Sequence, residues 1–171
     1  MAAIEAGTTL DQRYELLAPL SDRGIGESWQ ARDRQHEGRE VGVKLLKPLG
    51  GGATAIPREL LDHIKALRAF RHDDILSVIN HGLWQTRPYL VYDLFEGSSV
   101  GSALDEARRE EKLIELSLVE ALFDRVCKVV HAAHRAPRPL LHLTLTPGSV
   151  LFRGAAADLT VRVVDFGLAR H

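Results

Sequence analysis

The sequence predicts an α+β fold, because the chain divides into a strand-rich first half and a helix-rich second half. Between residues 14 and 92, short apolar segments with the alternation of β-strands are interrupted by one amphipathic helical segment over 56–71. Residues 100–135 are mostly of helical periodicity. Residues 140–171 then hold two short apolar runs around a turn rich in Gly and Ala, which predicts a β-hairpin.

The first half is predicted to contain five strands and one helix after a flexible lead-in. Residues 1–12 are small and polar, which is typical of a loose terminus. The helix has Pro57 near its start, a position that suits proline. Gly50, Gly51 and Gly52 form a flexible connector rather than a phosphate loop, because no Gly-Lys-Ser/Thr follows. The strands are predicted over residues 14–20, 28–32, 39–46, 75–80 and 88–92.

The second half begins at a hinge over residues 93–97, where Gly97 precedes two serines. A short helix is expected over 100–107. A longer one is expected to end at about Arg135, opened by a capping box of Ser117 and Glu120. The longer helix has more apolar positions than one narrow stripe needs, so it is expected to be covered on more than one side.

Composition excludes several classes of function. With 22 Lys and Arg against 23 Asp and Glu, the formal net charge is −1, so neither nucleic acid nor an anionic membrane is expected as a partner. The single cysteine, Cys127, excludes an internal disulfide and a multi-cysteine zinc site. The first twenty residues lack the apolar run of a signal peptide, and no membrane-spanning run is present. The expected location is the cytoplasm.

Four motifs, in order along the chain, carry a family resemblance. They are Val41-Gly42-Val43-Lys44, His72-Asp73-Asp74-Ile75, Tyr89-Leu90-Val91-Tyr92-Asp93 with Gly97, and Asp165-Phe166-Gly167-Leu168-Ala169-Arg170. Over residues 13–171 the chain therefore resembles the eukaryotic-type Ser/Thr protein kinase domain that is also found in bacteria. The resemblance implies a kinase-like N-lobe over 13–92, with a five-stranded antiparallel sheet and one helix, a hinge over 93–97, and a partial, mainly helical C-lobe over 98–171.

The resemblance also implies a nucleotide site with ATP and Mg²⁺ as cofactors. Lys44 corresponds to the lysine that neutralises the α- and β-phosphates, and Asp165 to the aspartate that binds Mg²⁺. Taken alone, a lysine inside an apolar strand either reaches solvent or meets an anion. The remaining nucleotide-contacting positions are Gly26, Asp93, Phe95 and Leu151.

Some positions depart from the family pattern in the first half. Ser21 and Arg23 replace the first two glycines of the phosphate-covering loop. His63 aligns with the helix glutamate that holds the lysine, and Glu59, one turn earlier, is the alternative.

The catalytic loop departs most from the family. Thr144 stands at the position of the catalytic Asp, Thr146 at that of the following Lys, and Ser149 at that of the metal-binding Asn. A threonine hydroxyl is no general base near neutral pH, and a general base typically contributes about 10²–10⁴-fold. Ser149 would be a weaker Mg²⁺ ligand than a carboxylate.

The sequence therefore favours a pseudokinase, with residual ATP binding, that acts through protein binding or regulation. Two alternatives stay open. The chain is the N-terminal part of an active Ser/Thr kinase that uses a displaced acid, or it is a structural fragment that binds a partner without nucleotide.

The chain stops soon after Asp165, so truncation of the kinase-like domain is expected. The helix over 118–135 should then expose an apolar flank for a protein partner or a second copy. The resemblance further implies that Leu67, Val78, His142 and Phe166 stack as an apolar column.

Overall fold

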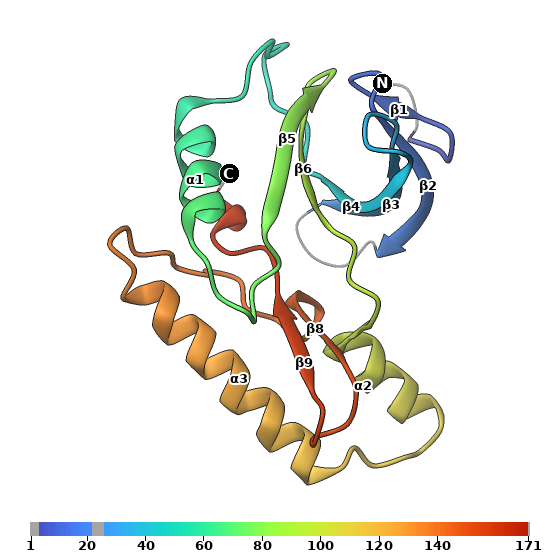
Figure 1. The fold of residues 1–171 in the computed structure, drawn as a ribbon, viewed down its shortest axis with the longest axis vertical. Helices are drawn as coiled ribbons and strands as arrows, with labels where there is room; N and C mark the ends of the chain where they lie inside the picture. The colour runs from blue at the N-terminus through green and yellow to red at the C-terminus, as the bar shows by residue number, and fades with distance from the viewer. Residues whose placement is uncertain (1–3, 22–25, 171) are drawn as a thin grey trace. The chain divides into compact units, whose positions relative to one another are not determined.

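The computed structural model describes residues 4–21 and 26–170, and the α+β prediction is confirmed (Figure 1). Arg23, which was expected to lie in the phosphate-covering loop, falls outside the described residues. The chain forms two compact units. The first unit comprises Met1–Arg68 and Ser77–Leu94, and the second comprises Ala69–Leu76 and Phe95–His171.

The first unit is built on an antiparallel sheet with the strand order β1-β2-β3-β4-β6-β5. Its strands are β1 (Thr9–Leu10), β2 (Tyr14–Ser21), β3 (Glu27–Asp33), β4 (Arg39–Leu45), β5 (Val78–Trp84) and β6 (Arg87–Asp93). The five predicted strands are joined by a short sixth, β1, which lies in the expected lead-in. Leu10 is fully buried, and this apolar contact holds the segment against β2.

The position of β4 in the sheet explains its composition. Residues 41–45 are all buried, as a strand with neighbours on both edges and both faces requires. The core of the unit gathers around Leu16, Val43 and Val91. Helix α1 (Arg58–Ala69) buries Leu60, Ile64 and Leu67, at the spacing of one helical face.

One strand lies further along the chain than predicted. The segment expected over 75–80 forms β5 over Val78–Trp84, because the residues before it are bound within the second unit. Ile75 forms a bridge with Val163, and the Leu76 N–H donates to the Val163 carbonyl at 3.1 Å. These contacts hold Ile75 and Leu76 in the second unit.

The second unit contains two helices and a three-stranded antiparallel sheet of order β7-β8-β9. Its elements are β7 (Ser98–Ser99), α2 (Val100–Arg109), α3 (Leu116–His134), β8 (Val150–Arg153) and β9 (Thr160–Val163), with 3₁₀ turns at Pro147–Ser149 and Leu168–Arg170. The predicted hairpin is confirmed as β8 and β9. No helix in the described ranges is long and apolar enough to cross a membrane.

Helix α2 begins where it was predicted, whereas α3 begins earlier than predicted. Ser99 caps α2, accepting the Ser102 N–H at 3.0 Å. The capping box predicted for α3 is wrong, since Glu115 is the N-cap and makes no side-chain cap bond. The Leu118 N–H closes the first turn on the Glu115 carbonyl at 3.1 Å, which places Ser117 inside the helix.

A buried carboxylate anchors the segment between α1 and β5 within the second unit. Asp74 is almost fully buried, and Arg125 of α3 lies 3.3 Å from its carboxylate. The Asp74 carbonyl accepts the Val163 N–H at 2.8 Å. The segment is thereby fixed to both α3 and β9.

Candidate functional site

His142 joins two of the sequence motifs in the second unit. Its ring Nε2 donates to the Val164 carbonyl at 2.8 Å, and its own carbonyl accepts the Gly167 N–H at 3.1 Å. The ring centroids of His142 and Phe166 are 4.7 Å apart, which confirms that pair of the predicted apolar column. The loop with Thr144 and the turn with Asp165 are therefore held together by backbone bonds and ring packing.

Asp165 combines a buried side chain with a left-handed backbone conformation. Its carboxyl-bearing side chain is buried, and its backbone φ is +67°, a left-handed conformation that costs free energy for any residue with a Cβ. The preceding Val164 and the following Gly167 are bound to neighbouring backbone, which holds this conformation.

Thr144 lies on the exposed surface of its loop, one residue after a strained position. Leu143 has φ +67° and is about half exposed, and the Thr144 N–H closes a tight turn on the His142 carbonyl at 2.9 Å. No Asp or Glu occurs between residues 125 and 157. This loop therefore has no carboxylate of its own that would take the proton from a substrate hydroxyl.

Ser149 is buried and uses its hydroxyl within the loop. The hydroxyl accepts the Thr146 N–H at 3.0 Å and donates its proton to the Thr146 carbonyl at 2.8 Å. The Pro147-Gly148 turn between the two residues brings these atoms together. These hydrogen bonds were not predicted from the sequence. A Pro-Gly pair flanked by Thr and Ser nevertheless favours such local bonds between side chain and backbone.

We expect Ser149→Ala to lower the free energy of unfolding of the second unit by about 1–2 kcal/mol, because the Thr146 N–H loses its acceptor and the Thr146 carbonyl keeps only the Ser149 N–H as a donor. Hydrogen exchange of residues 144–150 measures this. Thr144→Ala, at an exposed site without such bonds, is the matched control and should change little. Equal exchange rates in both variants would show that the Ser149 bonds do not order the loop.

Lys44 is the next-to-last residue of β4 and lies opposite Ser28 of β3 and Leu90 of β6. Its side chain is buried, so the alternative in which it reaches solvent is wrong. On α1, Glu59 is exposed and His63 is half-buried.

Gly26 has a packing role at the end of β4. Its φ is +94°, and a Cβ at this position would lie 2.0 Å from the Leu45 carbonyl oxygen. No side chain fits there without backbone movement. Packing against β4 is therefore enough to explain the glycine at this position, without any contact to a nucleotide.

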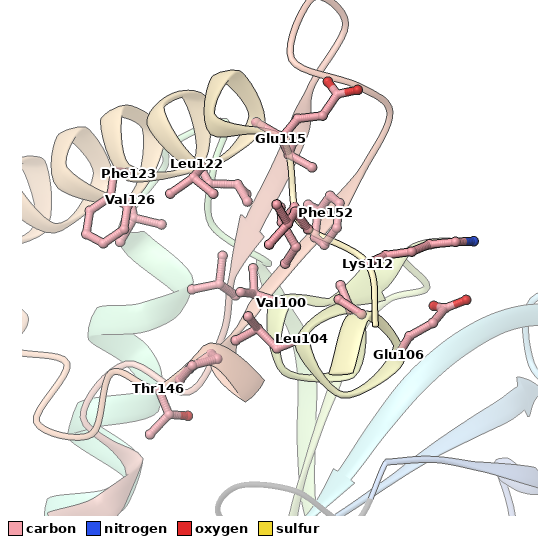
Figure 2. A pocket seen from close by; sticks show the side chains of 18 of the residues that line it. Val100, Leu104, Glu106, Lys112, Glu115, Leu122, Phe123, Val126, Thr146 and Phe152 are labelled. Carbon is pink, nitrogen blue, oxygen red and sulfur yellow. The ribbon is translucent and has the colours of Figure 1, made fainter. Parts of the chain in front are cut away.

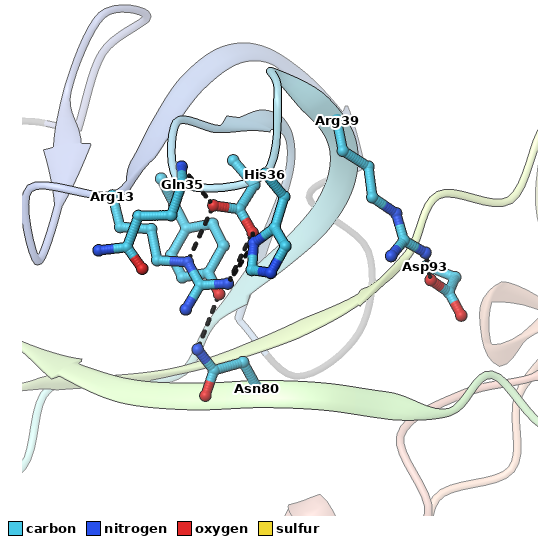
Figure 3. Close-up of polar contacts among 8 residues, drawn as sticks. Arg13, Gln35, His36, Arg39, Asn80 and Asp93 are labelled. Atoms are coloured by element: carbon cyan, nitrogen blue, oxygen red, sulfur yellow. Dashed lines mark hydrogen bonds and ion pairs between the residues drawn. The ribbon is translucent and has the colours of Figure 1, made fainter.

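Two residues from the predicted hinge have partners of their own. The Asp93 carboxylate is ion-paired with Arg39 across the sheet of the first unit (Figure 3). The Phe95 ring, in the second unit, lies beneath the guanidinium groups of Arg153 and Arg162 at 5.7 and 5.8 Å. Leu151, half-buried in β8, pairs with Ser99 and Arg162 of the neighbouring strands.

Comparison with known proteins yields no matching family model. A probable serine/threonine-protein kinase of Clostridium perfringens is 25% identical over 164 residues, which is 96% of this chain and 22% of that protein. Serine/threonine-protein kinase PksC of Streptomyces coelicolor is 28% identical, covering 90% of this chain and 27% of that protein. The crystal structure of a double mutant of the Mycobacterium tuberculosis PknI kinase domain superposes with a TM-score of 0.79 at 22% identity, over 98% of this chain and 63% of that chain.

The chain has a protein-kinase-like fold. The kinase-like domain spans about a fifth of the length of the first curated relatives it matches, so their names describe much longer proteins. The predicted fold class is confirmed by the structural likeness.

The side chains of the kinase-like domain fit a protein-held metal ion poorly. Mg²⁺ is usually held by one or two carboxylates together with substrate phosphates. Asp165 offers one carboxylate, while the hydroxyl of Ser149 is already bonded to Thr146 on both its donor and acceptor sides. Within residues 4–21 and 26–170, no cluster of three or more His, Cys, Asp or Glu side chains is placed to hold a metal. A metal ion would therefore depend on nucleotide phosphates for most of its ligands.

Proposed function

We propose that this kinase-like domain is a pseudokinase that acts by binding other proteins and transfers no phosphate itself. The observation that carries the proposal is the state of the loop around Thr144. It holds no carboxylate, and the hydroxyl of Ser149 serves the Thr146 backbone. An efficient phosphotransferase needs a positioned proton acceptor and two metal-side ligands.

Residual nucleotide binding is part of the proposal. Lys44 is buried in the first unit, and Asp165 is buried in the second. The family resemblance assigns Lys44 to the position of the phosphate-binding lysine and Asp165 to that of the Mg²⁺-binding aspartate. Lys44 would neutralise phosphate charge, and Asp165 would contact the metal that accompanies the phosphates; the metal would supply Lewis-acid stabilisation of that charge.

The experiment combines thermal unfolding with a phosphotransfer assay. We expect ATP with Mg²⁺ to raise the melting temperature by about 5 °C when the nucleotide is a hundredfold above its Kd, because that ratio stabilises by about 2.7 kcal/mol. Lys44→Ala should abolish the shift. Transfer of phosphate to a generic protein substrate should not exceed the background of a heat-inactivated sample.

Two results would contradict the proposal in different ways. Phosphotransfer that is lost in both Lys44→Ala and Asp165→Asn would identify an active kinase that uses a displaced acid; the relatives are themselves named as serine/threonine-protein kinases. A complete absence of any ATP shift would leave a structural module without nucleotide. Asp62→Asn, on the exposed side of α1, is the control for both variants.

A further inference from the structure

The sheet of the second unit has an apolar face and a polar face. Phe152 of β8 lies opposite Val161 of β9, and Figure 2 shows the Phe152 ring near side chains of α3, on the apolar face. Successive residues of a strand point to opposite faces, so Arg153, Thr160 and Arg162 lie on the polar face. Arg153 is directly opposite Thr160, which makes Arg162 its diagonal neighbour. Diagonal positions are about 7–8 Å apart, so the two arginines lie side by side.

The ring of Phe95 holds both guanidinium groups in place. Their Cζ atoms lie 5.7 and 5.8 Å from the ring centroid, within the range of a cation–π interaction. Gly97 permits this packing, because a Cβ there would lie 2.5 Å from Cε1 of Phe95 and 2.5 Å from the Phe152 carbonyl oxygen. The guanidinium of Arg162 is further fixed by donating to the Val161 carbonyl at 2.8 Å. Two positive groups that repel each other are therefore held over one ring.

The charges of this arginine pair are not neutralised by the protein groups around them. Neither guanidinium forms an ion pair with any residue that the structure describes. The acidic side chains of the flanking connections are placed otherwise. The Asp158 carboxylate accepts the Ala155 N–H at 2.8 Å, and Glu96, beside Phe95 in the chain, is exposed. Two adjacent guanidinium groups in this state form a binding site for an anion.

A phosphoryl group matches two guanidinium groups better than a carboxylate does. A carboxylate carries one charge and two oxygens, which a single guanidinium satisfies with two parallel hydrogen bonds. A phosphorylated serine or threonine carries about −1.5 to −2 charge and three acceptor oxygens, enough for both arginines. The hydroxyl of Thr160, opposite Arg153, is a further donor on the same face.

The surroundings of the arginine pair favour a phosphorylated protein over other sources of phosphate. Leu151 is half-buried and lies opposite Arg162 on the same face, so a residue beside the phosphorylated one has an apolar contact that a free phosphate ion lacks. A nucleic-acid backbone is bound by a row of cations along its length, whereas β8 and β9 together provide two on this face.

We propose that Arg153 and Arg162, held over the Phe95 ring, bind a phosphorylated serine or threonine of a partner protein. The inference deepens the proposed function as a protein-binding module and rests on it, since it names the chemistry of the partner. The phosphoryl oxygens accept hydrogen bonds from both guanidinium groups, and their charge offsets the repulsion between the two arginines. A guanidinium stacked on a ring keeps its N–H groups available at its edge. The phosphoryl group stays on the partner throughout.

Three dye-labelled peptides test this inference by fluorescence anisotropy with the whole chain, in the absence of ATP. They share the sequence Gly-Ala-Leu-X-Leu-Ala-Gly, in which X is phosphoserine, serine or glutamate. We expect the phosphoserine peptide to bind at least tenfold more tightly than the serine peptide and at least threefold more tightly than the glutamate peptide. Both preferences should weaken as salt screens the charges.

Substitutions then locate the binding site. Arg153→Gln and Arg162→Gln should each weaken binding of the phosphoserine peptide about tenfold and leave the serine peptide unchanged. Arg162→Lys keeps the charge but not the planar guanidinium, so it should recover only part of the loss. Arg138→Gln, at an exposed arginine of the same unit outside this sheet, is the matched control and should change binding by less than about twofold. Circular dichroism checks that each variant is folded.

Several outcomes would overturn the inference. Equal affinity for the phosphoserine and serine peptides, or binding unaffected by both glutamine variants, would show that the arginine pair does not bind the phosphoryl group. Equal affinity for the glutamate peptide would assign the pair to carboxylates. Inorganic phosphate, or a single-stranded oligonucleotide at equal phosphate concentration, that displaces the labelled peptide as well as unlabelled phosphoserine peptide would assign it to that ligand. Displacement by ATP that persists in Lys44→Ala would assign it to nucleotide phosphates.

Failure of this inference and failure of the proposed function are distinguishable. Peptide binding is measured without ATP or phosphotransfer, so its absence leaves the nucleotide and pseudokinase predictions standing. Detection of phosphotransfer would refute the pseudokinase without changing the affinity for the phosphoserine peptide.

Discussion

Gly26→Ala is expected to lower the free energy of unfolding of the first unit by about 3 kcal/mol. An alanine at φ +94° costs about 1–2 kcal/mol by itself. Its Cβ would also lie 2.0 Å from the Leu45 carbonyl oxygen, so the end of β4 would have to move. Urea unfolding followed by tryptophan fluorescence measures the effect, because Trp29 and Trp84 both belong to the first unit.

The control for this prediction is Gly50→Ala. Gly50 has no left-handed φ, and a Cβ there would meet nothing within 4 Å. Its substitution should leave stability unchanged or raise it slightly, by restricting the unfolded chain. Equal midpoints for the two variants would refute the packing role of Gly26. The comparison also matters for function, because loss of ATP binding in Gly26→Ala would otherwise be read as loss of a phosphate contact.

Asp33→Asn is expected to cost the first unit about 2–3 kcal/mol at neutral pH. Asp33 is buried at the end of β3, and Arg13 binds both of its oxygens, at 2.9 and 2.7 Å. His36 Nδ1 lies 2.9 Å from the same carboxylate, and the Gln35 N–H donates to it at 3.0 Å, in the cluster shown in Figure 3. Removing the charge of Asp33 leaves the partly buried guanidinium of Arg13 without its counter-ion. An uncompensated buried charge is strongly destabilising.

This prediction has a defined pH dependence. The hydrogen bond from Arg13 is the main cause that lowers the pKa of Asp33 to about 2, from an ordinary value of 3.8. Because the folded state favours the ionised form of Asp33, the contribution of this carboxylate to stability is complete above about pH 4 and is lost as pH falls toward 2. The shift corresponds to about 2 kcal/mol. The difference in stability between the wild-type chain and Asp33→Asn should therefore shrink over this interval.

Asp93→Asn is the matched control for Asp33→Asn. Asp93 also pairs with an arginine, Arg39, on the same sheet, but the side chains of both are more than half exposed. Exposed pairs contribute about 0–1 kcal/mol, so this variant should unfold close to the wild-type midpoint at every pH. If the two variants were equally destabilised, the buried cluster around Asp33 would not be the cause.

Elements whose pattern is local were predicted well from the sequence. In the strand that contains Lys44 and the helix that contains Leu60 and Ile64, the spacing of apolar residues is visible within one short segment. Both elements lie at the residues where they were predicted. The position of β5 was not predictable in this way. Residues 75 and 76 have a strand-like composition, but their hydrogen-bond partner is Val163, almost ninety positions away in the chain.

The candidate site was predictable as a set of residue types but not as a set of contacts. The identity of Thr144 alone shows that no carboxylate stands at that position. The bonds of Ser149 depend on how the Pro147-Gly148 turn folds, and the environment of Gly26 depends on the path of β4; neither is visible in a window of neighbouring residues. The left-handed backbone of Asp165 is likewise imposed by distant partners.

The assignment of residues Ala69–Leu76 to the second unit limits how the domain can be dissected. The chain crosses between the units at three places, after Arg68, Leu76 and Leu94. A fragment or chimera joined at position 94 would carry Asp74 and Ile75 away from Arg125 and Val163, leaving a carboxylate without its counter-ion and an apolar side chain in water. The two units are therefore not interchangeable modules, and recombination with a relative would have to exchange residues 69–76 together with the second half.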